Sequence, residues 1–156
     1  MTNWLRFRHE EANYFGTLED DSIVIHEGDL FDNPHRTNQT LSLDNVEILI
    51  PCLPTKMVGL WNNLKSVATK KRREIPEDPL YFVKPPSCYL PHNGIIHRPI
   101  SYSGQVLYEG ELAIVIGRQC TNVTVEESPD VIFGYTCAND VTAIQFIHQN
   151  KHFQQW

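Results

Sequence analysis

The run of residues 106–116 constrains the fold more than any other part of the sequence. Most of its residues are apolar, several are β-branched or aromatic, and Gly117 follows it directly. Such a run predicts a strand, and the apolar residues on both of its faces favour a place inside a sheet. Glu109 and Glu111 interrupt it. Residues two apart on a strand point to the same face, so we expect these two carboxylates side by side.

Two neighbouring carboxylates on an apolar strand repel each other, and removal from water raises the free energy of both. A bound divalent cation would offset both effects, and all-oxygen ligation favours Mg²⁺, Mn²⁺ or Ca²⁺ over zinc. A solvent-facing pair of glutamates is the simpler alternative. Asp140 adds a third carboxylate, because it follows a strand predicted over residues 135–139, where that strand gives way to a helix. Strand ends of this kind are common places for ligands.

Composition excludes several classes of protein. The 156 residues carry 13 Lys and Arg against 19 Asp and Glu, a formal net charge of −6, which argues against a nucleic-acid-binding protein. No apolar run is long enough to span a membrane, and the first residues do not resemble a signal peptide. We therefore expect a cytoplasmic protein without membrane partners. Its four scattered cysteines are expected to be reduced thiols.

Hydrophobic periodicity predicts a mixed, mainly β fold with two or three short helices. Helices are expected over residues 62–73 and from Thr142, and Pro34 favours a loop over residues 29–39. The strands are expected over residues 4–9, 13–18, 23–26, 46–50, 56–60, 80–83, 106–116 and 135–139.

Three ordered motifs carry a resemblance to a known family. They are Phe82-Val83-Lys84-Pro85-Pro86-Ser87, Tyr108-Glu109-Gly110-Glu111-Leu112-Ala113-Ile114-Val115-Ile116-Gly117 and Gly134-Tyr135-Thr136-Cys137-Ala138-Asn139-Asp140-Val141-Thr142-Ala143. In order and spacing they resemble the fumarylacetoacetate hydrolase family. The resemblance implies a β-sandwich roll, with a small β-rich N-terminal domain over residues 1–53 and the first portion of a catalytic domain over residues 54–156. In the family, further strands follow the position of Trp156, so we expect a fragment or a truncated gene product.

The resemblance also implies a function. In the family, residues matching Glu109, Glu111 and Asp140 bind Mg²⁺ or Mn²⁺, which stabilises an enolate formed from a small 2-oxo or diketo acid. The lysine that matches Lys84 lies near the substrate carboxylate, although a strand-end lysine reaching solvent is the alternative here. Family members usually pair, so the resemblance further implies a homodimer.

The sequence departs from the family at its His-x-x-Glu pair, which activates the attacking water. Lys65 and Ala68 stand at those positions, and a shift by one residue gives Ser66 and Thr69. We therefore expect isomerisation or decarboxylation rather than hydrolysis, with Lys65 binding a second substrate carboxylate and the general base unknown. The alternative is a catalytically inactive family member or fragment that serves as an interaction module. Ile144, where many members have an arginine, is a further departure that argues against family-type hydrolysis.

Overall fold

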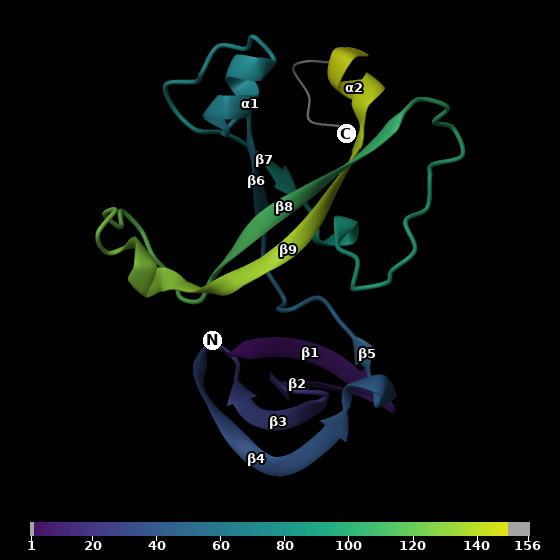
Figure 1. Ribbon diagram of the computed structural model, residues 1–156, viewed down its shortest axis with the longest axis vertical. Coiled ribbons are helices and arrows are strands. Elements are labelled where there is room, and N and C mark those ends of the chain that lie inside the picture. Colours follow the sequence, from purple (N-terminus) through teal and green to yellow (C-terminus); the bar gives the residue numbers. More distant parts are fainter. Residues whose placement is uncertain (1, 150–156) are drawn as a thin grey trace.

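The computed structural model describes residues 2–149, with side chains as far as residue 147, and in this part the strands form three antiparallel sheets (Figure 1). The strands are β1 Asn3–His9, β2 Ala12–Glu19, β3 Ser22–Asp29, β4 Asp32–Ser42, β5 Glu47–Ile48, β6 Met57–Trp61, β7 Leu80–Lys84, β8 Val106–Ile116 and β9 Ile132–Ala143. The helices are α1 Lys65–Lys70 and α2 Ile144–Gln149, with 3-10 turns at Leu43–Asn45, Pro86–Cys88 and Ser128–Val131. The prediction of a mainly β fold with short helices is confirmed.

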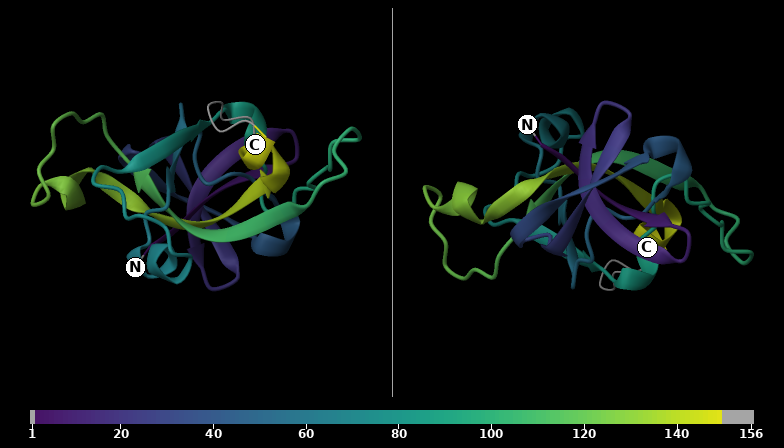
Figure 2. Two further views of the ribbon diagram at one scale, coloured as in Figure 1. Left: turned by 90° about the horizontal axis from the view of Figure 1, so that it is seen from above. Right: turned by 90° about the horizontal axis from the view of Figure 1, so that it is seen from below.

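The first sheet holds the hydrophobic core that the described residues bury most deeply. Its strand order is β4-β3-β2-β1-β5. Figure 1 shows this sheet curled at the bottom of the molecule, below the β8–β9 ribbon, and Figure 2 shows the same arrangement from above and from below. Alternation along β1 and β3 turns Phe7, Ile23 and Ile25 to the inside, where they are buried and packed by partly buried neighbours from the same sheet and the turn after it. A curled sheet of this kind can bury one apolar face without a helix to cover it.

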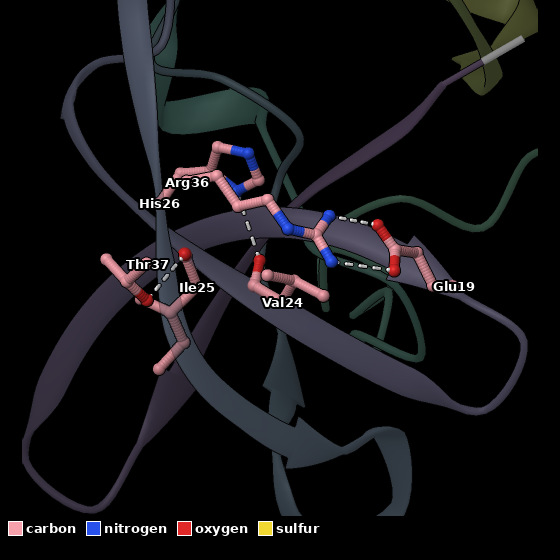
Figure 3. A network of polar contacts seen from close by, with 6 residues as sticks. All are labelled: Glu19, Val24, Ile25, His26, Arg36 and Thr37. Carbon is pink, nitrogen blue, oxygen red and sulfur yellow. Dashed lines mark hydrogen bonds and ion pairs between the residues drawn. The ribbon is translucent and has the colours of Figure 1, made fainter.

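The loop predicted over residues 29–39 is wrong, because residues 32–42 form β4. This strand lies at the edge of the sheet, where Pro34 removes no hydrogen bond that a second neighbour would need. Two register shifts between β3 and β4 bend the edge. Figure 3 shows how side chains fix it: the Thr37 hydroxyl donates to the Ile25 carbonyl at 2.8 Å, and Arg36 forms an ion pair with Glu19.

The remaining strands form two separate ribbons, β6–β7 and β8–β9. The strand predicted over residues 135–139 is too short: β9 continues to Ala143, because its last residues keep pairing with the start of β8. The helix expected from Thr142 begins at Ile144, and the helix expected over residues 62–73 is the shorter α1.

Phe133 joins the first sheet to the β8–β9 ribbon. Val115 pairs with Gly134 and Ile116 pairs with Ile132, so Phe133 is the extra residue of a bulge. A bulge redirects its side chain. The ring of Phe133 lies 4.9 Å from Phe31, edge to face, and 6.2 Å from Trp4.

The outer face of the β8–β9 ribbon is apolar and exposed. Leu112 is 69% exposed and Ile114 54%, and Tyr108 and Tyr135 are exposed beside them. The expectation that residues 106–116 lie inside a sheet is wrong for the described part of the chain, because β8 pairs there with β9 alone and no second strand covers it. Of the described residues, no helix is long and apolar enough to cross a membrane.

Candidate functional site

The pairing of β8 with β9 brings the predicted carboxylates onto one face. Glu109 lies directly opposite Asp140, and Glu111 lies opposite Ala138. Directly opposed residues of an antiparallel pair project to the same side, with Cβ atoms about 4.5–5.5 Å apart. Glu111, two residues from Glu109, projects to that side too. The register of one ribbon therefore gathers all three carboxylates.

Asp140 reaches this position in a different way from the one predicted. It was expected just beyond a strand, at the start of a helix, but it lies inside β9 with three strand residues after it. Val141 and Thr142 are β-branched and pair with Tyr108 and Leu107, which keeps the backbone extended past the aspartate. Asp140 is thus held by the hydrogen bonds of a strand and not by a strand end.

Lys84 supplies a cation to this face from the other ribbon. Its ammonium forms an ion pair with the Asp140 carboxylate, and the two side chains are only 18% and 19% exposed. The solvent-facing alternative for Lys84 is therefore wrong. The pair joins β7 to β9, which lie in separate sheets.

The surroundings of Lys84 explain how it is held. Gly59 pairs with Phe82, and a Cβ on that glycine would lie 2.4 Å from the phenyl ring, so the missing side chain makes room for Phe82. The Lys84 ammonium lies 5.8 Å from the centre of the same ring, within range of a cation–π interaction. On the other side, the Tyr89 hydroxyl donates to the Lys84 carbonyl at 3.0 Å. Residues on both sides thus fix the end of β7.

The donor chemistry of Glu109, Glu111 and Asp140 fits a hard divalent cation, since such cations prefer carboxylate oxygens. Asp140 already has a positively charged partner in the ammonium of Lys84. In the described part of the chain, however, the side chains as placed form no group of three or more ligands close enough to hold a metal. Glu109 and Glu111 are exposed and free to change rotamer. The metal-ligand role of the three carboxylates stays a prediction.

The positions of the missing His-x-x-Glu pair lie on α1. Lys65 opens this helix with an exposed side chain, and no ion pair of Lys65 is found in the described residues. Ala68 is fully buried. The structure does not bring Lys65 into contact with the carboxylates, so its role in substrate binding stays a prediction.

Sequence reasoning missed the contact between Lys84 and Asp140. The two residues are 56 positions apart, and no periodicity connects residues in different sheets. The family resemblance placed Lys84 near the substrate carboxylate, but it gave no contact between Lys84 and Asp140.

The structure is thus a mainly β protein in which Lys84 of one ribbon forms an ion pair with Asp140 of the other, on the face that also carries Glu109 and Glu111. The chain belongs to the fumarylacetoacetate hydrolase family: the family described as fumarylacetoacetate (FAA) hydrolase C-terminal matches residues 56–156. A second family, described as Rv2993c-like, N-terminal, matches residues 3–51.

Relatives extend this likeness over most of the chain. An uncharacterized protein of Archaeoglobus fulgidus is 41% identical over 138 residues, 88% of this chain and 51% of that protein. The oxaloacetate tautomerase YisK of Bacillus subtilis is 33% identical over 144 residues, 86% of this chain and 48% of its own length. The crystal structure of 2-hydroxyhepta-2,4-diene-1,7-dioate isomerase from Mycobacterium marinum matches with a TM-score of 0.79 at 29% identity, over 96% of this chain and 57% of that one. The chain spans about half the length of the curated relatives.

Proposed function

We propose that this chain carries the cation-binding half of an enzyme that isomerises or tautomerises a small 2-oxo dicarboxylic acid. The observation that carries the proposal is the register that sets Glu109 opposite Asp140, with Glu111 beside them and Lys84 next to Asp140. Two similar proteins support the reaction class by name, one an oxaloacetate tautomerase and the other an isomerase of an unsaturated dioate.

In this proposal Glu109, Glu111 and Asp140 hold Mg²⁺ or Mn²⁺, with Ca²⁺ as a further candidate. A divalent cation there would supply Lewis-acid polarisation of the 2-oxo group. The carboxylates orient the cation through the fixed backbone of β8 and β9. Lys84, already at the edge of the face, would bind a substrate carboxylate, and Lys65 would bind a second one if α1 closes over the site.

The residues of α1 favour isomerisation, tautomerisation or decarboxylation over hydrolysis. Ala68 is buried and carries no carboxylate, and Lys65 is a cation where the family has a histidine. Hydrolysis requires a group that removes a proton from the attacking water, whereas proton shift within the substrate does not require an activated water.

The test follows the decay of the enol form of oxaloacetate by its ultraviolet absorbance, with Mg²⁺ and with a chelator. Acylpyruvates and unsaturated 2-oxo dicarboxylates complete the panel. We expect Mg²⁺-dependent tautomerisation that is lost in Glu109→Gln and kept in Glu126→Gln, an exposed glutamate of a loop that serves as the charge-matched control. Fast Mg²⁺-dependent hydrolysis of an acylpyruvate would overturn the preference for isomerisation.

A second candidate is a catalytically inactive member that serves as an interaction module. The buried Ala68, which stands where the family has the glutamate of its His-x-x-Glu pair, favours it. Binding of Mn²⁺ without turnover of any substrate in the panel would support this candidate.

The first proposal also predicts a homodimer and a cytoplasmic location. Sedimentation at micromolar concentration tests the dimer.

A further inference from the structure

We propose that Lys84 is a displaceable counter-ion of Asp140, so that its ammonium and a divalent cation compete for the same carboxylate. The inference rests on the proposed function in one respect, namely that these carboxylates bind a divalent cation. It adds a state of the site in which the protein's own lysine neutralises the aspartate. Binding of the cation then requires the Lys84–Asp140 ion pair to break.

The burial of the pair carries the first step. The side chains of Lys84 and Asp140 are 18% and 19% exposed, so neither charge is well solvated. An Asp140 carboxylate without a positively charged partner would destabilise the fold, and the Lys84 ammonium neutralises it. A lysine is suited to this role, because its ammonium is a compact charge on a flexible stem that can swing away. An arginine would hold the carboxylate with two parallel hydrogen bonds and leave less readily.

The position of the pair carries the second step. Glu109 and Asp140 are tied to adjacent strands, whereas Lys84 comes from a different sheet. A divalent cation that draws Asp140 toward Glu109 takes it away from Lys84 without moving the backbone of either ribbon. In the ion pair the ammonium lies 5.8 Å from the centre of the Phe82 ring, so this ring is a neighbour that the freed ammonium can still contact. The ammonium is then available for an anionic substrate. Binding of the cation would thus release the group that binds the substrate carboxylate.

The experiment measures Mn²⁺ affinity directly on the 156-residue chain, from the electron paramagnetic resonance signal of free Mn²⁺. We expect Lys84→Met to bind Mn²⁺ about 10-fold more tightly than the wild type, because the cation no longer displaces a charged hydrogen bond. The control is Lys70→Met, which removes the same charge from an exposed end of α1 and should leave the affinity within about 2-fold, as expected for a distant surface charge. Lys84→Arg, which retains the ion pair, should not tighten binding.

A second measurement needs no variant. Acetylation of lysines, read by mass spectrometry, should be slow at Lys84 without metal and faster after Mg²⁺ is added, while Lys70 reacts at the same rate in both conditions. This readout also covers the case in which Lys84→Met does not fold.

The outcomes separate the two proposals. If the wild type binds Mn²⁺ and loses it in Asp140→Asn, but Lys84→Met binds no more tightly than Lys70→Met, the competition is refuted and the metal site stands. Weaker binding by Lys84→Met would also refute it, since Lys84 would then support the metal. If no variant with intact carboxylates binds Mn²⁺, the proposed metal site is wrong and the competition fails with it.

Discussion

Replacement of Phe133 by alanine should weaken the contact between the first sheet and the β8–β9 ribbon. The bulge in β9 directs this side chain to Phe31 at 4.9 Å and to Trp4 at 6.2 Å. Aromatic pairs of this kind contribute about 0.5–1.5 kcal/mol each beyond the area they bury. Two such pairs, together with the area that this half-buried ring covers, predict a loss of about 2–4 kcal/mol in the free energy of unfolding, against about 3–5 kcal/mol for a fully buried phenylalanine.

The assay is equilibrium unfolding in urea, followed by circular dichroism and by tryptophan fluorescence. The ring of Trp4 lies 6.2 Å from Phe133 and 4.7 Å from His26, so the emission of Trp4 should change in Phe133→Ala before unfolding begins. The matched control is Tyr135→Ala, which removes an aromatic ring from the same strand, but from its exposed outer face. We expect a change below about 0.5 kcal/mol there.

A double-mutant cycle isolates the pair. The free energy of unfolding should fall by less in the double variant Trp4→Leu/Phe133→Ala than the sum of the decreases in the two single variants, because either change removes the same ring contact. Equal decreases in the free energy of unfolding for Phe133→Ala and Tyr135→Ala, or full additivity in the cycle, would refute the idea that the bulge joins the first sheet to the β8–β9 ribbon.

Two further predictions concern the first sheet. Phe7→Ala should lower the free energy of unfolding by about 3–5 kcal/mol in the urea assay, because the ring is fully buried and stacks on Tyr14 at 5.7 Å; a loss below 1 kcal/mol would show that this core is not closely packed. The ion pair with Arg36 holds the pKa of Glu19 below its ordinary value of 4.5, so its contribution to stability is fully present above that pH and is lost as the pH falls through the folded-state pKa. In Arg36→Met, the NMR titration midpoint of Glu19 should rise toward 4.5, and an unchanged midpoint would contradict the assignment.

The sequence predicted strands well where alternation and turn residues agree. The hairpin of β2 and β3 and the full extent of β8 follow from local pattern, because each residue's preference points to the same structure. Pro34 misled the prediction for β4, since a proline excludes a central strand but not an edge strand, and only the sheet order distinguishes the two. The division of the chain at residues 53 and 54 stays a prediction.

The sequence named Glu109, Glu111, Asp140 and Lys84 as candidate site residues, but it did not give their arrangement. Spacing alone places Glu109 and Glu111 on one face, whereas the position of Asp140 depends on the register of β9 against β8. A change of one residue in that register would turn the aspartate to the opposite face. The contact with Lys84 depends on how two sheets lie against each other, which local sequence does not encode.

The carboxylates of the site are positioned by strand register, whereas Lys84 is positioned by a contact between sheets. We therefore expect Lys84 to move more easily than the backbones of Glu109 and Asp140. The backbones of Glu109 and Asp140 are held by the hydrogen bonds of one ribbon, so the face to which both side chains point is set before any cation arrives. Lys84 belongs to another ribbon and reaches Asp140 through its own flexible side chain. When a cation binds, the ladder between β8 and β9 should therefore keep its register while Lys84 changes its partner. Amide hydrogen exchange tests this directly: protection in β8 and β9 should be unchanged or higher with Mg²⁺. Loss of protection around Asp140 would mean that the strands themselves rearrange. The pairing of β8 with β9 would then not position the carboxylates in advance of the cation.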